Sequence, residues 1–341
     1  MKLGIIGDPH FREQLSYSDF IPDGRKAEFQ AVLDKTVEFF QDCDGVVFLG
    51  DNFDKKTNPN SVIRAFTEFV ERFNGKEIYI LAGNHEKSAD GSSAIDYLRE
   101  IKNPKWHVIT NTIEEINRMV FCPYFFRQEL GVVTHEEATA MLIKNIPTGK
   151  YLFTHHAISD TLTNGGNSTN VFDEIILPKT ELEKRFDLII GGHIHRPGIY
   201  GKTLVAGSLF TNEAGDRNNA VWKIDTETNK IEKCMLPVRY IFRFENTAPA
   251  VISKLAQEWP NSIVKVVLTD KALKESLEGL KSAGKGFDTF ILQEQYPRER
   301  EKKSASEENL LEVGIESLIK VYAEQKKIDY APLLAAWNEL K

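Results

Sequence analysis

This sequence of 341 residues has few cysteines, no long apolar run and no excess of positive charge. Its three cysteines, Cys43, Cys122 and Cys234, are an odd number without paired spacing, which argues against a disulfide framework and a zinc knuckle. No stretch approaches the roughly 20 apolar residues that cross a bilayer, and the apolar start Met1–Ile6 is too short for a signal peptide. We therefore expect a protein of the cytoplasm (the host cytoplasm if its source is viral) or of another reducing compartment.

Five short apolar runs, at residues 3–7, 45–49, 78–82, 151–153 and 188–190, each lead directly into side chains that can bind metal ions. The blocks that follow them are Asp8-Pro-His10, Gly50-Asp51, Gly83-Asn84-His85-Glu86, His155-His156 and Gly192-His193-Ile194-His195. The runs are rich in β-branched and aromatic residues, which predicts buried strands. Because ligands of open α/β sheets bind beyond the carboxyl ends of the strands, we expect the five ends to meet on one rim.

One such block alone would more often be structural, since a histidine beside a glycine is usually a turn residue. The ordered set is different, because gathering unpaired Asp and His side chains on one rim costs free energy unless a cation binds there. A mixed oxygen and imidazole donor set suits Mn, Fe or Zn better than Mg or Ca. The glycines at positions 7, 50, 83 and 192 fit sharp turns or close approach of a ligand to the backbone.

The motifs D-x-H, G-D, G-N-H-[DE], H and G-H-x-H, in this order, resemble the signature of calcineurin-like metallophosphoesterases over about two-thirds of the chain. The resemblance implies two metal ions about 3.5–4 Å apart. Its implied ligands are Asp8, His10 and His195 for the first ion, Asn84, His155 and His193 for the second, and Asp51 as the bridge. His156 remains an alternative to His155, which we favour because it comes first after its strand.

His85 resembles the histidine of the family that does not bind metal and faces the scissile phosphate. There it would donate a proton to the leaving oxygen or stabilise the charged transition state. Glu86 stands where many members of the family have Asp, and the resemblance implies that it orients His85.

The pattern of strands and helices, read with this resemblance, implies an α/β fold over residues 1–238, with two stacked β-sheets flanked by helices in a four-layer sandwich. Helices are predicted at Arg25–Cys43 and Ser61–Phe73 from apolar residues at helical spacing. Thr134 and Glu137 predict a capping box for a third helix. Further strands are predicted at 205–210, 220–225 and 230–236.

A second, smaller domain is predicted to begin at residue 239. Residues 239–296 read as a small α/β cap of pattern βαβαβ, with strands at 240–244, 262–268 and 288–295 and helices at 249–259 and 272–282. The charge-dense segment 297–306 reads as a linker, and 307–341 as a helical tail. The apolar faces of the tail contain Leu311, Ile315, Leu318, Ile319 and Tyr322, then Leu333, Leu334, Trp337 and Leu340. These faces either fold back on the cap or bind a partner.

This architecture resembles SbcD-type DNA repair nucleases, including their phage counterparts. The resemblance implies Mn²⁺-dependent hydrolysis of DNA, with 3′→5′ exonuclease action on duplex ends and endonuclease action on single strands. It also implies a homodimer and a tail that binds an SMC-like coiled-coil ATPase. That partner would handle ATP, because this sequence has no G-x-x-x-x-G-K-[ST] loop.

Contacts to DNA are expected from loops at 11–24, 52–58 and 164–170, with Arg12, Lys55 and Lys56 as candidates for phosphate binding. Solvated surface charge is an equal alternative for these three. The net charge of −7 argues against tight DNA binding without metal, since nucleic-acid binders are usually basic, but does not exclude a nuclease. A phosphomonoesterase or cyclic-nucleotide phosphodiesterase is the alternative function, and a non-catalytic scaffold a weaker one.

Overall fold

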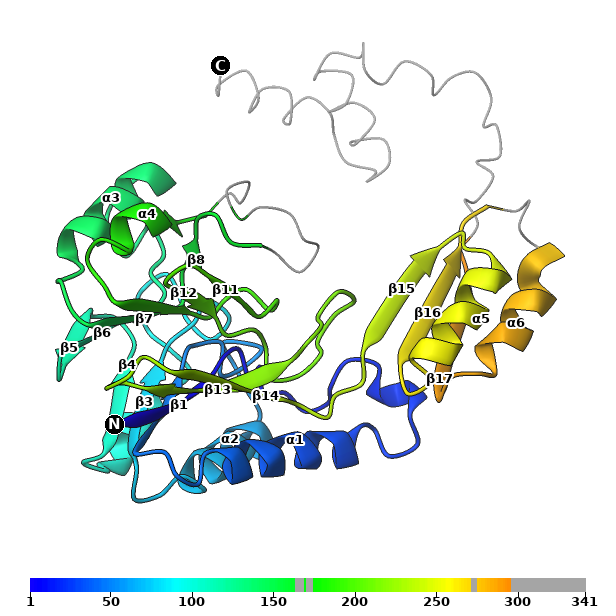
Figure 1. Ribbon diagram of the computed structural model, residues 1–341, viewed down its shortest axis with the longest axis horizontal. Coiled ribbons are helices and arrows are strands. Elements are labelled where there is room, and N and C mark those ends of the chain that lie inside the picture. Colours follow the sequence, from blue (N-terminus) through cyan, green and yellow to red (C-terminus); the bar gives the residue numbers. More distant parts are fainter. Residues whose placement is uncertain (163–168, 170–173, 271–274, 296–341) are drawn as a thin grey trace, which may run out of the picture. The chain divides into compact units, whose positions relative to one another are not determined.

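The computed structural model describes residues 1–162, 169, 174–270 and 275–295, and two six-stranded sheets form its larger part (Figure 1). The first sheet has the order β14 (Ile231–Met235), β13 (Ala220–Asp225), β1 (Lys2–Ile6), β2 (Gly45–Phe48), β3 (Glu77–Leu81) and β4 (Trp106–Ile109). The second has the order β11 (Gly198–Tyr200), β12 (Thr203–Val205), β10 (Leu188–Gly191), β7 (Tyr151–Thr154), β6 (Met119–Cys122) and β5 (Glu114–Ile116). The central strands β1–β4, and likewise β6, β7, β10 and β12, are parallel.

The two sheets pack face to face because alternate residues of each strand point to opposite sides. In β1, Leu3 and Ile5 belong to the core between the sheets, together with Phe153 of β7 and Ile190 of β10. The next residue, Ile6, points the other way and packs under the helices. Central strands buried on both faces explain why their sequences are continuously apolar.

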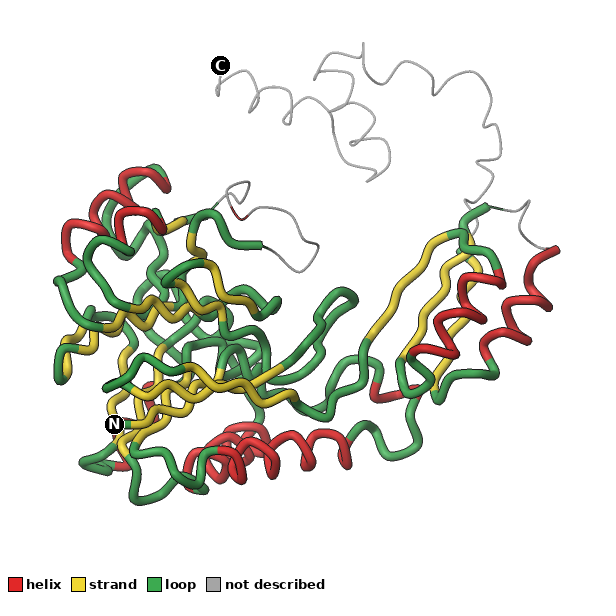
Figure 2. The backbone as a smooth tube through the Cα atoms, in the orientation of Figure 1, coloured by secondary structure: helices red, strands yellow, loops and turns green. Residues whose placement is uncertain are grey.

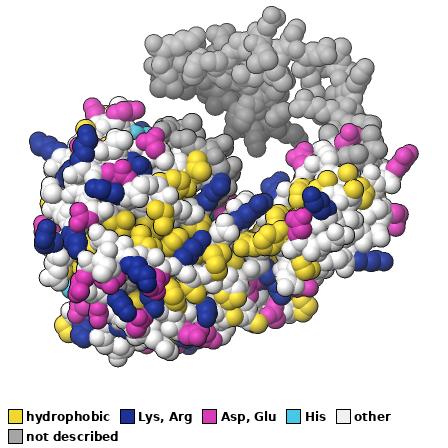
Figure 3. Space-filling view, viewed as in Figure 1, with side chains coloured by type: hydrophobic (Ala, Val, Ile, Leu, Met, Phe, Trp, Pro, Cys, Tyr) yellow, Lys and Arg dark blue, Asp and Glu magenta, His cyan; other side chains and the backbone are white. Residues whose placement is uncertain are grey.

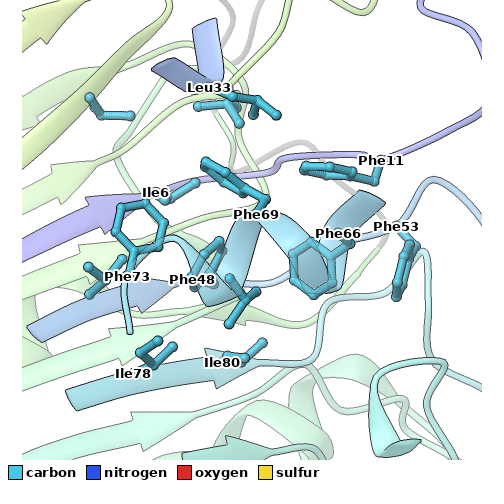
Figure 4. Close-up of a cluster of buried hydrophobic side chains, with 14 of the residues drawn as sticks. Ile6, Phe11, Leu33, Phe48, Phe53, Phe66, Phe69, Phe73, Ile78 and Ile80 are labelled. Carbon is cyan, nitrogen blue, oxygen red and sulfur yellow. The ribbon is translucent and has the colours of Figure 1, made fainter. Parts of the chain in front are cut away.

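Helices cover the outer face of each sheet (Figure 2). The helices α1 (Lys26–Phe39) and α2 (Asn60–Glu71) pack on the first sheet, where Phe66 and Phe69 of α2 meet Phe48 and Ile80 (Figure 4). The helices α3 (His135–Asn145) and α4 (Lys179–Leu182) pack on the second sheet. The predicted capping box at the start of α3 is confirmed: Thr134 accepts from the Glu137 N–H, and Glu137 accepts from the Thr134 N–H. The four-layer α/β fold is therefore the one expected from the sequence.

Residues beyond β14 form a separate three-stranded sheet. Its elements are β15 (Ile241–Glu245), α5 (Pro249–Glu258), β16 (Ile263–Leu268), α6 (Leu277–Gly284) and β17 (Thr289–Glu294). All three strands are parallel, in the order β15-β16-β17, and both helices lie on one face (Figure 1). Right-handed crossovers in the same direction require that arrangement. The buried Ile241 and Ile263 contact Ile21, next to the short 3₁₀ helix Ser18–Phe20.

The remaining regular elements of the described chain are small. They are β8 (Ala157–Ile158) paired with β9 (Ile176–Leu177), and the 3₁₀ helix Asp96–Ile101. Among the described residues, no helix combines the length and apolarity needed to cross a membrane. By compactness the chain divides into Met1–Glu294 and Gln295–Lys341. The predicted linker (297–306) and tail (307–341), with all its candidate partner-binding residues, lie outside the described residues.

One strand prediction is wrong in part. The sequence predicts a strand at 205–210, but β12 ends at Val205. Gly207 has φ +78°, a left-handed conformation that ends the strand, and a Cβ at this position would lie 2.8 Å from Pro197. The turn places the Ser208 N–H 3.3 Å from the carbonyl of His195. An apolar run thus forms a loop beside the candidate site.

Candidate metal centre

The five predicted blocks do lie together, but at the carboxyl ends of strands from two sheets rather than on the rim of one. Asp8, Asp51 and Asn84 follow β1, β2 and β3 of the first sheet, whereas His155 and His193 follow β7 and β10 of the second. Hydrogen bonds join the two groups. The His155 Nδ1–H donates to the carbonyl of Leu49 at 2.7 Å, and the His193 N–H donates to Asp8 Oδ1 at 2.9 Å.

Asp51 occupies the middle of the centre. Its Oδ2 lies 3.2 Å from His155 Nε2 and 3.8 Å from His10 Nε2, and its Oδ1 accepts from the His85 N–H at 2.9 Å. It belongs to two sets of donors whose atoms lie within 4.8 Å of one another, one with His10 and His85 and one with His155 and His193. A carboxylate shared by two donor sets has the position that a bridging ligand requires.

Several nitrogen and oxygen atoms of the centre face one another at hydrogen-bond distance. His10 Nε2 and His195 Nε2 are 3.0 Å apart, and His193 Nδ1 is 3.0 Å from Asn84 Oδ1. Within the described chain, the buried Asp8 Oδ2 has no hydrogen-bond partner. Buried polar atoms normally have partners, and a cation bound here would give one to Asp8 Oδ2. The residues present therefore fit two divalent ions.

The choice between His155 and His156 follows from which way each ring points. His155 turns Nε2 toward Asp51. His156 turns Nε2 away and accepts the backbone N–H of Phe125 at 3.1 Å, with its ring stacked on Tyr124 at 4.8 Å. The structure therefore brings His155 to the centre and packs His156 into the protein.

The backbone at the centre is strained. Asp8, His10, Asp51 and His193 all have positive φ, of 39°, 45°, 47° and 71°. Such conformations in non-glycine residues cost free energy and cluster at functional sites. The neighbouring glycine at position 83 allows the close packing, because a Cβ there would lie 2.2 Å from Asp51 Oδ1.

Electrostatic coupling favours the charged forms of Asp51, His155 and His195. Burial opposes ionisation of Asp51, but the imidazoles of His155 and His10 lower its pKa below the usual range. Burial likewise opposes protonation of His155, but the carboxylates of Asp51 and Asp8 raise its pKa to about 10. Burial is also outweighed at His195, where Asp216 raises the pKa to about 9. Cations bound here would have to displace these protons.

The metal-free protein should therefore lose stability as the pH rises from about 6.5 to 10. A histidine whose pKa is higher in the folded than in the unfolded state stabilises the fold fully below the unfolded value of 6.5, and that contribution is lost as the pH passes the folded values of about 9 and 10. His10 and His156, whose pKa values are lowered, oppose this decline only near its start, where the unfolded chain still binds part of their protons. Thermal melts of chelated protein would measure the decline, which should be smaller in His195→Gln. A melting temperature that rises across the window would contradict it.

His85 differs from the other histidines of the centre in its exposure. Its side chain is 43% exposed, and its Nδ1 lies 3.1 Å from the carbonyl of Asp54. Glu86, by contrast, is buried and accepts from the Asn52 side chain and the Gly83 N–H, both at 2.9 Å. The hydrogen bond that orients His85 thus comes from Asp54, and the role of Glu86 in orienting it stays a prediction. Burial and the charge of Asp51 raise the pKa of Glu86 to about 7.

Two carboxylates at the centre were not predicted from the sequence. Glu174 lies 2.9 Å from His193 Nε2, and Asp216 lies 3.4 Å from His195 Nδ1. Both stand in irregular segments about 20 residues from the histidine they contact, outside any motif. A local sequence pattern could not have found them.

The three basic residues considered for DNA binding differ in their surroundings. Arg12 contacts Asp54 Oδ1 at 3.1 Å and donates to the carbonyl of His10 at 3.3 Å, so it is held within the protein beside the centre. Lys55 and Lys56 are exposed, and Lys56 Nζ lies 5.7 Å from the ring centre of Phe126. The loop 164–170 lies outside the described residues except for Thr169. DNA contacts by all three stay predictions.

Residues 1–197 match the family described as calcineurin-like phosphoesterase. No curated protein is significantly similar to the chain. Among solved structures, the chain is similar to one described as a novel archaeal phosphodiesterase, with 16% identity, a TM-score of 0.34, and coverage of 69% of this chain and 100% of the other. It is similar to a protein of Thermus thermophilus (14%, TM-score 0.40, 69% and 98% covered) and to a hypothetical protein of Pyrococcus horikoshii (14%, TM-score 0.31, 82% and 97% covered). Sequence identities and TM-scores this low do not indicate an activity.

Proposed function

This chain belongs to the calcineurin-like phosphoesterase family, and we propose that it is a two-metal-dependent nuclease that hydrolyses DNA phosphodiester bonds. Family membership makes it a metal-dependent hydrolase of phosphoesters. The observation that carries the metal dependence is Asp51, whose carboxylate stands between two sets of donors. Two divalent cations at such a site hold the phosphate and lower the pKa of an attacking water.

The residues of the chain would divide the remaining work. Asp8, His10 and His195 would hold one ion, and Asn84, His155 and His193 the other, with Asp51 touching both. His85 is exposed beside them, held through Nδ1 by Asp54, and would act through Nε2 on the leaving oxygen or on the charge of the transition state.

The choice of DNA as substrate rests on the order of domains and segments along the chain rather than on surface charge. A βαβαβ sheet follows the phosphoesterase domain, and a polar linker and amphipathic tail follow in sequence, as in SbcD-type nucleases. On the face in Figure 3, Lys and Arg side chains are interspersed with Asp and Glu and form no single basic stripe. Binding would therefore depend on metal-held phosphate and a few basic residues, of which Arg12, Lys55 and Lys56 are the candidates.

Nuclease activity should be strong with Mn²⁺, weak with Mg²⁺ and absent after chelation, because imidazole donors favour Mn²⁺ over Mg²⁺. The measurement is degradation of end-labelled duplex DNA and of circular single strands, beside hydrolysis of small phosphate monoesters and cyclic nucleotides. Cleavage of DNA from 3′ ends supports the proposal. Hydrolysis of small esters with no action on DNA would favour another phosphoesterase, and full activity after exhaustive chelation would exclude the two-metal reaction.

We also propose that the protein works as a homodimer with an SMC-like coiled-coil ATPase, which the tail would bind. Deleting residues 307–341 should then leave metal content and basal Mn²⁺-dependent cleavage nearly unchanged, since every proposed ligand precedes that segment. Association with the ATPase, and any ATP-linked stimulation, should be lost. The fold-back alternative expects the reverse: normal co-purification with the ATPase but a much lower melting temperature.

A further inference from the structure

His193 and His195 each turn one ring nitrogen toward another proposed metal ligand. The other ring nitrogen of each histidine lies near a carboxylate. His193 turns Nδ1 toward Asn84 Oδ1 at 3.0 Å, and its Nε2 lies 2.9 and 3.1 Å from the two oxygens of Glu174. An ionised carboxylate has no proton to donate, so it can only accept a hydrogen bond from this ring. Glu174 therefore selects the tautomer with the proton on Nε2, which leaves the Nδ1 lone pair free on the side of Asn84.

His195 shows a looser arrangement, in which a carboxylate lies within ion-pair distance of the other ring nitrogen, Nδ1. Its Nε2 lies 3.0 Å from His10 Nε2, and Asp216 Oδ1 lies 3.4 Å from its Nδ1. Asp216 is fully buried, and its Oδ2 accepts from the backbone N–H groups of Asn212 at 2.8 Å and Glu213 at 3.1 Å. The carboxylate is thus fixed by its own loop, and the same loop is anchored by Arg217, whose guanidinium lies 5.1 Å over the ring of Phe242 in β15.

We propose that Glu174 and Asp216 are positioning residues of the metal centre. Each would hold the proton on one ring nitrogen of its histidine, so that Nδ1 of His193 and Nε2 of His195 are the atoms free to bind a cation. Metal-binding histidines commonly donate their other ring N–H to such a partner, and its loss typically weakens metal binding about 10–100-fold. Because His193 and His195 are proposed ligands of different ions, Glu174 would act on one ion and Asp216 on the other.

This inference rests on the proposed two-metal centre, and its test is metal binding rather than cleavage. Mn²⁺ binding to the full chain would be titrated calorimetrically and checked by metal analysis after dialysis. Glu174→Ala should weaken one of the two binding steps about 10–100-fold, and Glu174→Gln, which keeps an acceptor oxygen, should weaken it less. Asp216→Asn should weaken the other step and, by keeping an oxygen for the Asn212 and Glu213 N–H groups, preserve the loop. Glu181→Gln, an exposed charge on α4, is the control and should change neither step.

A double-mutant cycle identifies the contacts. Glu174→Ala should have no further effect in a His193→Ala background but keep its full effect in a His195→Ala background, and Asp216→Asn should show the opposite pattern. Equal effects in both backgrounds, or unchanged affinities in folded single variants, would overturn the proposal. Loss of one whole equivalent of metal in Glu174→Gln would also overturn it, because that result would make Glu174 a ligand. Two-metal binding with these couplings but no action on DNA would leave this inference standing and reject only the nuclease.

Discussion

Replacing Asp51 by alanine should remove both metal ions and abolish hydrolysis. Asp51 Oδ2 lies between His155 Nε2 and His10 Nε2, at 3.2 and 3.8 Å, so its loss takes a ligand from each donor set. It also leaves these imidazoles facing one another without the carboxylate between them. We expect metal content to fall from two equivalents toward zero, and kcat/KM to fall at least about a thousandfold, or about 4 kcal/mol.

Two further variants make this result specific to the bridge. Asp51→Asn keeps the shape and one oxygen, and should retain part of the metal. Asp44→Asn removes a carboxyl at the opposite end of the same strand, where Asp44 accepts from the Lys2 N–H, and should leave both ions and activity unchanged. Metal analysis and melting curves would be run on each. A stable Asp51→Ala protein that still holds two ions would show that Asp51 does not bridge.

Replacing His85 by alanine should stop cleavage while both ions stay bound. His85 is the exposed histidine of the centre, its Nδ1 is held by the Asp54 carbonyl at 3.1 Å, and its Nε2 is 3.9 Å from Asp51 Oδ2. A group that donates a proton to the leaving oxygen or stabilises its charge typically contributes about 10²–10⁴-fold, so we expect kcat to fall by that factor. Metal content should remain at two equivalents.

The control for His85→Ala is His107→Ala. His107 is also partly exposed but lies on β4, where it pairs with Glu77 at 3.0 Å, and its loss should leave kcat unchanged. The atoms of His85, His10 and Asp51 lie close enough together to share an ion. Loss of one equivalent of metal in His85→Ala would therefore identify His85 as a ligand and reject its role on the leaving group.

Local sequence determines two features here: the buried strand and the metal-binding side chain at its end. An apolar run such as 45–49 favours a strand buried on both faces, and Asp51 must then emerge where that strand stops. The capping box at Thr134 and Glu137 was predictable for the same reason, because both partners lie within one helical turn. The order of such blocks was specific enough to identify the family and the candidate donors. Each of these inferences depends on residues adjacent in the chain.

Tertiary structure decided the features that depend on where a side chain points and on partners that are distant in the sequence. His155 and His156 are consecutive, yet one ring faces Asp51 and the other accepts from Phe125, a difference that composition cannot express. The expected single rim proved to be the meeting of two sheets, because strand pairing and not strand composition assigns β7 and β10 to a second sheet. Glu174 and Asp216 reach their histidines only because irregular loops fold back on the strand ends, and hydrogen bonds between distant residues leave no local pattern in a sequence.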